Sequence, residues 1–387
     1  MALKNKTYYT YKDVTIVPCN ISSIEHRGDC NPYVDGDKLP LFTAPMDTVI
    51  NEKNFNLFSE NGIIPILPRT ENITKRVEYT ENGLWAAYSL DEFEKYICES
   101  ALHKSGEEPM KALLDIANGH MEKVLKVSST AKQKYGADIE IMAGNIANPD
   151  TYLLYAKSGI DYCRCGIGAG DGCLSTSNTG VHFPMASLID EIKAKKDIVE
   201  SNNSGFNSVP KIVADGGIRN YSDIIKALAL GADYVMCGSM FAKMFESAAA
   251  KTYDKYGRNR MRVLPSVVTH DLTEEILSDL KDFKVTDGIW TAVTSKGETF
   301  ELGHVNALFY GMASVEGQIA LHGMKVRTSE GLSKLLPVKY TMKGWVENFK
   351  DYLCSAMSYA GCQRLDQFRN NTTLIVNSSN AISVVNK

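Results

Sequence analysis

Residues 211–239, KIVADGGIRNYSDIIKALALGADYVMCGS, decide the fold class. Two short apolar runs, Lys211–Ala214 and Tyr234–Cys237, each end at glycine turns. Between them, residues 221–230 place their apolar side chains on one side of a helix, and Gly231 follows the last turn. A strand, a glycine turn, a helix and a second strand form the repeating unit of an α/β protein with parallel strands.

The same unit recurs along the chain, for example where Asp150 opens the helical segment Thr151–Lys157 and Gly159 follows it. The predicted strands are Leu41–Met46, Ile63–Leu67, Leu84–Tyr88, Ala112–Ile116, Ile139–Ala143, Tyr162–Ile167, Lys211–Ala214 and Tyr234–Cys237. Eight strand–helix units are the number that closes into a barrel, so the sequence predicts a (β/α)8 barrel. A doubly wound open sheet also alternates strands and helices and is the alternative.

We expect one catalytic barrel domain over residues 1–369, an insertion or small subdomain at 245–305, a flap after the eighth strand, and a flexible tail at 370–387. The insertion contains a helix candidate near Thr273–Leu280 and a hairpin candidate, Trp290–Thr294 and Glu298–Leu302 around the turn Ser295–Gly297.

Composition narrows the functional class. The 387 residues carry 42 Lys and Arg against 46 Asp and Glu, a formal net charge of −4, and 44% of them are hydrophobic. This composition excludes intrinsic disorder, and it lacks the basic footprint of a nucleic-acid binder. No apolar run approaches a membrane span, the start lacks a secretory leader, and the nine cysteines have no disulfide-framework spacing. We therefore expect a cytoplasmic protein with reduced thiols and small-molecule partners.

In such barrels the active site lies at the carboxyl ends of the strands, and phosphate binds after the seventh and eighth. The seventh strand is followed by Asp215, Gly216 and Gly217, and the eighth by Gly238 and Ser239. Glycine turns allow backbone N–H groups to approach phosphate oxygens, and a carboxylate there can accept hydrogen bonds from sugar hydroxyls. Two ordinary strand–helix turns are the alternative interpretation.

Two other segments carry reactive side chains. The loop Gly166–Gly180 contains four alternate glycines and then Cys173, a thiol placed as a nucleophile at the barrel mouth. A bystander thiol is the alternative. Further along, Glu330 lies in the polar segment Arg327–Gly331, where it is a candidate general acid or acceptor for a base edge, or else a solvated charge or helix cap.

Taken together, these segments resemble the family of IMP dehydrogenase and GMP reductase. The similar segments cover most of the chain except 245–305. They are Tyr11–Pro18, Pro45–Val49, Asp115–Gly119, Met142–Asn145, Gly166–Gly180, Ala214–Gly217, Phe309–Met312, Ser329–Gly331 and Ser355–Gly361.

Within the family, the chain resembles the reductase branch. It has no room for the pair of regulatory CBS domains typical of the dehydrogenases, and no Arg-Tyr pair occurs among the 12 residues between Ser314 and Arg327. The segments Thr179–Pro184 and Arg327–Gly331 are also similar to GMP reductase. The resemblance implies reductive deamination of GMP to IMP and ammonia with NADPH, NADH being possible, and a homotetramer that binds a purine nucleotide monophosphate.

The resemblance also implies residue roles. Cys173 would attack purine C2 to form a thioimidate, and Ser175 with Glu330 would relay a proton to the departing ammonia. The implied substrate contacts are Asp215, Gly216, Gly217, Gly238, Ser239, Gly311, Met312, Ala313, Arg327, Thr328, Ser329 and Gly331. The implied cofactor contacts are Arg69, Asp115, Ile116, Ala117, Ile167, Gly168, Ser355, Ala356, Met357 and Ser358. A monovalent cation, K+, would bind the carbonyls of Gly168, Gly170 and Cys173.

Some positions depart from the family pattern. Ser175 stands where Thr is usual and keeps the hydroxyl, Thr176 replaces an Arg near the cation site, and His182 and Met185 replace Gly and Gln. Three alternatives stay open: a dehydrogenase converting IMP to XMP with NAD, a nucleotide-binding barrel without turnover, and a reductase acting on another purine (deoxy)nucleotide.

Overall fold

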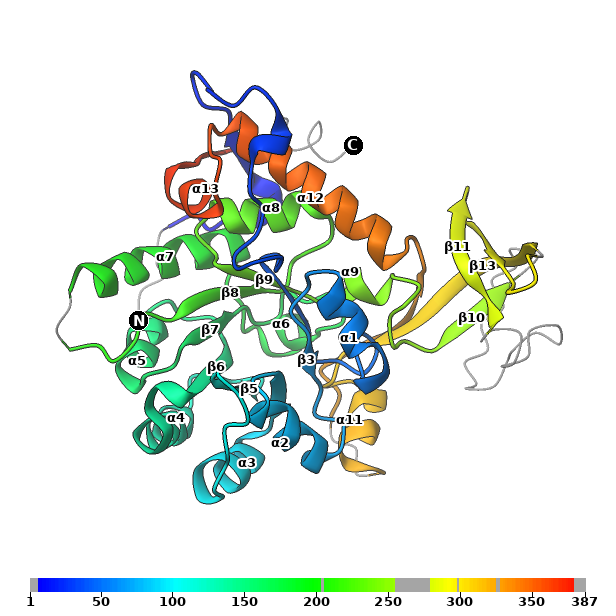
Figure 1. Ribbon diagram of the computed structural model, residues 1–387. Coiled ribbons are helices and arrows are strands. Elements are labelled where there is room, and N and C mark those ends of the chain that lie inside the picture. Colours follow the sequence, from blue (N-terminus) through cyan, green and yellow to red (C-terminus); the bar gives the residue numbers. More distant parts are fainter. Residues whose placement is uncertain (1–5, 203–204, 255–278, 298, 325–327, 379–387) are drawn as a thin grey trace.

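The barrel predicted from the sequence is present. The computed structural model describes residues 6–378 except 203–204, 255–278, 298 and 325–327. Eight parallel strands follow the order β2-β9-β8-β7-β6-β5-β4-β3. Hydrogen bonds from Thr43 N–H to the Ile64 carbonyl, 3.0 Å, and from Ile64 N–H to the Leu41 carbonyl, 2.9 Å, join the two ends of this sheet. The sheet is therefore closed, and helices surround it (Figure 1).

The barrel strands are β2 (Leu41–Thr43), β3 (Ile66–Leu67), β4 (Trp85–Tyr88), β5 (Met110–Asp115), β6 (Ile139–Ile146), β7 (Tyr162–Cys165), β8 (Lys211–Asp215) and β9 (Tyr234–Cys237). The helices between and after them are α1 (Glu52–Glu60), α2 (Ile73–Glu81), α3 (Leu90–Phe93) continued by the π-helix η3 (Glu94–Glu99), α4 (Glu122–Tyr135), α5 (Thr151–Ser158), α6 (Ser175–Thr179), α7 (Met185–Ser201), α8 (Tyr221–Ala229), α9 (Ser239–Ala242), α11 (Val315–His322), α12 (Met342–Tyr359) and α13 (Leu365–Asn371). Short 3-10 turns are η1 (Tyr11–Asp13), η2 (Arg27–Asp29) and η4 (Gly136–Asp138).

Some strand limits differ from the sequence prediction. Strand β2 ends at Thr43 rather than Met46, because Pro45 has no N–H to donate to a neighbouring strand. Strand β7 ends at Cys165 because Gly166, with φ 133°, turns the chain into the glycine loop. These early ends leave the loops free to form the barrel mouth.

A second, antiparallel sheet lies beside the barrel. It contains β10 (Lys251–Asp254), β11 (Lys281–Thr286), β12 (Ile289–Val293), β13 (Thr299–Tyr310) and β14 (Ser333–Pro337). The predicted hairpin is confirmed as β12 and β13, in which Val293 pairs with Thr299 and Gly297 supplies a φ of 85° in the turn.

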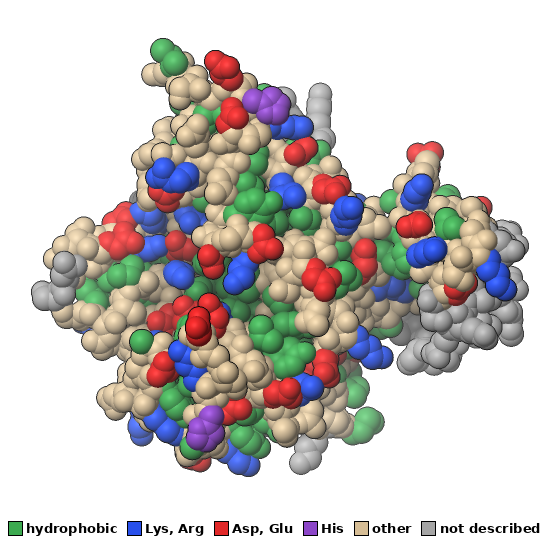
Figure 2. Space-filling model, in the orientation of Figure 1, with side chains coloured by type: hydrophobic (Ala, Val, Ile, Leu, Met, Phe, Trp, Pro, Cys, Tyr) green, Lys and Arg blue, Asp and Glu red, His purple; other side chains and the backbone are tan. Residues whose placement is uncertain are grey.

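This sheet has a core of its own, around the fully buried Trp290, whose Nε1 donates to the Val338 carbonyl at 3.0 Å. It projects as a lobe from the barrel (Figures 1 and 2), and β13 runs from the lobe back to the barrel mouth (Figure 1). Residues 273–278 of the predicted helix lie outside the described residues.

Part of the segment predicted as a tail forms a strand. Thr373–Val376 forms β15, which pairs antiparallel with β1 (Val14–Val17) near the start of the chain. Main-chain hydrogen bonds to β1 hold this segment, although Ile375 and Val376 are exposed. Residues 379–387 lie outside the described part.

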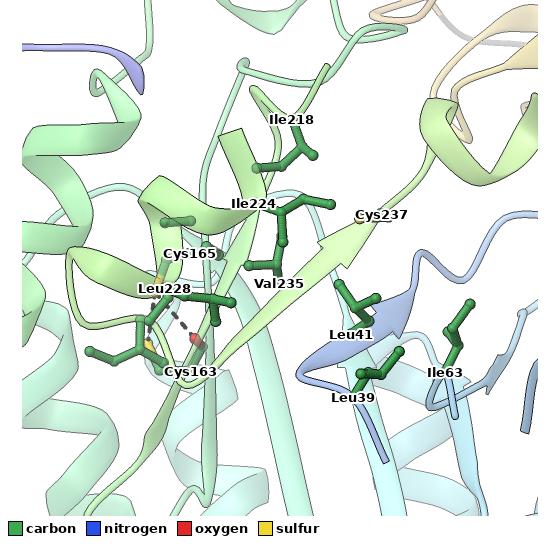
Figure 3. Packing of buried hydrophobic residues seen from close by; sticks show 14 of the residues in the cluster. Leu39, Leu41, Ile63, Cys163, Cys165, Ile218, Ile224, Leu228, Val235 and Cys237 are labelled. Carbon is green, nitrogen blue, oxygen red and sulfur yellow. Dashed lines mark hydrogen bonds between the residues drawn. The ribbon is translucent and has the colours of Figure 1, made fainter. Parts of the chain in front are cut away.

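Two apolar layers hold the barrel. Outside the strands, Ile224 and Leu228 of α8 pack toward Val235, Cys163 and Cys165 (Figure 3). Inside, an aromatic cluster of Phe42, Trp85, Tyr162 and Tyr234 closes the barrel interior, with Trp85 and Tyr162 edge to face at 5.0 Å between ring centroids. Among the described residues, no helix is long and apolar enough to cross a membrane.

Candidate active site

Strand alternation places three charged residues inside the barrel. Side chains two apart on a strand share a face. Tyr162 and Arg164 of β7 therefore both point inward, as do Leu113 and Asp115 of β5, and Val213 and Asp215 of β8 follow the same rule. The apolar members of these pairs belong to the interior cluster, and the charged members line the cavity at the strands' carboxyl ends.

These charged groups form one network. Arg164 donates from Nε to Asp215 Oδ2 at 2.9 Å and from Nη1 to Asp115 Oδ1 at 2.5 Å. Asn145 also donates to Asp215 Oδ2, at 2.8 Å, and to the Gly166 carbonyl at 2.7 Å. Burial acts to lower the pKa of the Arg164 guanidinium, but the charges of Asp215 and Asp115 prevail and raise it above its usual value. The network therefore fixes Asp215 and Asp115 relative to each other.

The cysteine loop is held by a second long-range contact. Cys173 and Gly331 form an antiparallel bridge, in which Leu174 N–H donates to the Glu330 carbonyl at 2.7 Å and Leu332 N–H donates to the Gly172 carbonyl at 3.0 Å. This main-chain pairing brings residues more than 150 positions apart into contact.

The predicted catalytic residues are brought together by this pairing. The Cys173 thiol lies 3.3 Å from Ser175 Oγ, and the Ser175 hydroxyl donates to Glu330 Oε2 at 2.7 Å. Cys173 and Glu330 line the cavity, whereas Ser175 lies between them behind its wall. A thiol, a hydroxyl and a carboxylate in series have the geometry of a nucleophile connected to a proton donor.

The cavity encloses about 210 Å³ at the strands' carboxyl ends. It brings together one predicted cofactor residue, Asp115, and most predicted substrate residues. Those lining it are Asp215, Gly216, Gly217, Gly238, Ser239, Gly311, Met312 and Ala313. The cavity is also lined by Arg164, Met46, Asp171 and Phe309, for which the sequence predicted no role.

Of the two predicted phosphate-binding turns, the one after β8 has the backbone conformation that requires glycine. Gly216 and Gly217 have φ of 100° and 74°, the region that favours glycine. The N–H of Gly217 donates to the Ala169 carbonyl at 2.9 Å, so this predicted phosphate donor is already used within the chain. Gly238 and Ser239 lead into α9 and face the cavity.

Other predicted substrate residues support the wall rather than line it. The Ser329 hydroxyl donates to the Gly331 carbonyl at 2.9 Å and accepts from the Gly331 N–H at 3.3 Å, which orders the turn that carries Glu330. Thr328 is exposed beside it, and Arg327 lies outside the described residues.

Two of the three predicted cation carbonyls, those of Gly168 and Gly170, already accept hydrogen bonds. The Thr176 hydroxyl donates to the Gly168 carbonyl at 3.0 Å, and Cys173 N–H donates to the Gly170 carbonyl at 3.1 Å. A carbonyl oxygen has two lone pairs, so both remain compatible with a cation. His182 Nδ1 lies 2.8 Å from the Ile167 carbonyl, which fixes the same loop from its other side.

The predicted cofactor residues fall into two places. Asp115 ends β5 and is followed by Ile116 and Ala117, and Arg69 Nη1 donates to the Asp115 carbonyl at 3.4 Å. Ser355–Ser358 instead lie on α12, where Ser355 Oγ is 3.5 Å from Arg27 of η2, and none of them lines the cavity.

An α/β barrel whose mouth carries a thiol, a hydroxyl and a carboxylate in series is built as an enzyme. Residues 8–320 match the family model described as the IMP dehydrogenase/GMP reductase domain, and the chain belongs to this family of oxidoreductases.

Its relatives agree with this assignment. The chain is 27% identical over 385 residues to a GMP reductase of Staphylococcus carnosus, an alignment that covers 96% of this chain and 97% of the relative. It is 31% identical over 264 residues to the GMP reductase of Bacillus subtilis, with 65% of this chain and 75% of the relative covered. A GMP reductase of Exiguobacterium is 29% identical over 261 residues, again covering 65% and 75%.

Proposed function

We propose that this chain is a GMP reductase that converts GMP to IMP and ammonia with NADPH. The observation that carries the proposal is the series Cys173, Ser175, Glu330 at the cavity wall, with contacts of 3.3 Å and 2.7 Å. Named GMP reductases among the relatives, one of them aligned over nearly its whole length, support the same reaction.

The chain's own groups account for the bond changes. Cys173 Sγ attacks C2 of the purine, and the C2–N bond to the 2-amino group breaks. The departing nitrogen takes a proton through Ser175 and Glu330 and leaves as ammonia, which leaves a thioimidate between Cys173 and C2. Reduced nicotinamide, when bound, supplies the hydride to C2. The C2–S bond then breaks, and the thiolate leaves as IMP forms.

The interior network orients the sugar. Both protein donors to Asp215, Arg164 and Asn145, contact Oδ2. Asp215 lines the cavity, and its other carboxylate oxygen, Oδ1, would accept from ribose hydroxyls. Arg164 thereby acts as a positioning residue for the sugar contact.

The residues near β5 suit a nicotinamide dinucleotide. The buried Nε of Arg69 lies 3.9 Å from Glu92 and has no hydrogen-bond partner among the described residues, so it has a donor to offer. Asp115, Ile116, Ala117, Ile167 and Gly168 would hold the nicotinamide end. Ser355–Ser358, which do not line this cavity, would contact the cofactor outside it.

We also propose K+ at the carbonyls of Gly168, Gly170 and Cys173. Replacing K+ by Li+ in the buffer should lower the rate of turnover and change the protection of the cysteine loop in hydrogen exchange. The free state of all nine cysteines is consistent with the proposed cytoplasmic location. Light scattering of the purified chain tests the tetramer.

The test of the reaction follows nicotinamide absorbance with GMP and NADPH or NADH in one series, and with IMP and NAD in another. Cys173→Ala should abolish cofactor oxidation with GMP. Cys19→Ala, a thiol outside the cavity lining, is the matched control and should leave it intact. NAD reduction with IMP alone would assign the dehydrogenase reaction instead. Silence in both series would contradict the proposal and favour a binding protein or another purine (deoxy)nucleotide.

A further inference from the structure

One charge at the cavity wall is unexpected for a phosphate site. Asp171 lines the cavity together with Gly216, Gly238 and Ser239, at the turns where barrels of this kind bind phosphate. A carboxylate at such a place repels a phosphate ester unless other charges compensate. The partners of Asp171 therefore decide what this end of the cavity can bind.

Asp171 has partners that would serve a phosphate equally well. Lys334 Nζ lies 3.2 Å from Asp171 Oδ2 and donates to the Asp171 carbonyl at 3.1 Å. Ser239 lines the same cavity.

The backbone explains why Lys334 faces Asp171. The segment Glu330–Leu332 runs antiparallel to Gly172–Leu174, and β14 continues it, so Lys334 arrives beside Asp171. The two side chains are 34% and 26% exposed, which leaves them accessible to solvent and to a ligand.

Two further lysines lie close by. Lys243 directly follows α9, and its carbonyl accepts from the Lys339 N–H at 3.0 Å. Asp171, Lys334 and Lys339 all act on the pKa of Lys243, which places the four groups in one electrostatic cluster. Three lysines and one aspartate carry an excess positive charge of two, which suits a phosphate dianion, and Asp171 is the member of this cluster that lines the cavity.

We propose that Lys334 recognises the phosphate of a nucleoside monophosphate, and that the phosphate takes Lys334 from Asp171 as it binds. In the free enzyme the Asp171 carboxylate occupies the donors that the ligand needs. The identity of the nucleotide rests on the proposed function, whereas recognition of its phosphate requires no turnover. A nucleoside with a free 5′-hydroxyl held by Asp171 is the competing arrangement, and the excess positive charge disfavours it.

The experiment is calorimetric titration of the full chain with GMP and with guanosine, without cofactor. Lys334→Met should weaken GMP binding by about 10- to 100-fold, the range of a charge-assisted hydrogen bond, and leave guanosine binding unchanged. Asp171→Asn should tighten GMP binding several-fold, because Lys334 no longer needs to be taken from a carboxylate. Lys284→Met removes the same charge from the exposed face of β11 and should change neither affinity.

Equal weakening of GMP and guanosine by Lys334→Met would overturn the proposal, because Lys334 would then only support the loop. Unchanged GMP binding, or weaker guanosine binding in Asp171→Asn, would overturn it as well. IMP, XMP and AMP extend the titration, and failure of every nucleoside monophosphate to bind also counts against it. Phosphate-dependent binding that responds to Lys334→Met, with no oxidation of NADPH by GMP, would support this inference and refute the proposed reaction.

Discussion

Replacing Arg164 by methionine tests the charged network inside the barrel. The side chain is only 10% exposed, and it contacts two carboxylates that are 17% and 18% exposed. Removing one partner of a buried ion pair costs about 3–5 kcal/mol, because a charge stays buried without its counter-ion. Asp115 and Asp215 would face each other in this way, so the free energy of unfolding should fall by about 3–5 kcal/mol.

Arg164→Lys is the matched control. A lysine keeps the charge but has one ammonium group, whereas the guanidinium reaches Asp215 through Nε and Asp115 through Nη1. The loss should be about 2 kcal/mol, the size of one charge-assisted hydrogen bond. Urea denaturation followed by circular dichroism measures both variants.

The pH dependence of the stability of Arg164→Met tests whether repulsion between Asp115 and Asp215 causes the loss. Without Arg164, two neighbouring carboxylates disfavour each other's charge, so the pKa of one is raised above its value in the unfolded chain. The folded variant then binds more protons than the unfolded one, and its stability falls as pH rises. The deficit against the wild-type chain should be smaller at pH 5 than at pH 7. A variant within 1 kcal/mol of wild type, or a deficit independent of pH, would refute this account.

Three further predictions concern other parts of the chain. Ser175→Ala removes the hydroxyl between the Cys173 thiol and the Glu330 carboxylate, so kcat with GMP should fall about 10²- to 10⁴-fold with KM little changed, whereas Ser175→Thr should keep most of kcat. An alanine variant that turns over at the wild-type rate would exclude the relay. Burial acts to raise the pKa of Glu92, but Arg76 prevails and lowers it to about 2, so about 3 kcal/mol of stability is present above pH 4.5 and lost as pH falls toward 2. The gap in unfolding free energy between wild type and Glu92→Gln should close over that range in urea titrations, and a constant gap would contradict it. In Gly166→Ala the new Cβ would lie 1.9 Å from a carbonyl oxygen at φ 133°, so the free energy of unfolding should fall by about 1–3 kcal/mol in the same assay. Gly106→Ala has open space around it and should stay within about 0.5 kcal/mol of wild type, and equal losses in the two variants would argue against the steric cause.

Features set by neighbouring residues were predictable from the sequence. The barrel strands appear as apolar runs that end in turn residues, and Gly297 marks the hairpin of the lobe. Strand limits were less predictable, because Pro45 and Gly166 act through single backbone positions.

Contacts between distant segments were not predictable from local pattern. Strand β15 pairs with β1 from the other end of the chain, and nothing in its own residues names that partner. Arg164 had a usable signal: it is a charged residue two positions after Tyr162 on a buried strand, and alternation places both in the barrel interior. Its pairing with Asp115 and Asp215 needed the structure.

The position of Glu330 shows what the backbone adds to a set of side chains. Glu330 is 155 residues from Ser175, and its carboxylate reaches the hydroxyl because main-chain hydrogen bonds join its segment to the cysteine loop. These bonds do not depend on side-chain identity, so a serine in place of the usual threonine leaves the frame intact. The same segment carries Lys334, four residues on, to Asp171. The carboxylate proposed for proton relay and the ammonium proposed for phosphate recognition are therefore carried by one segment that leads into β14, and this segment would contact a nucleotide at both its base and its phosphate.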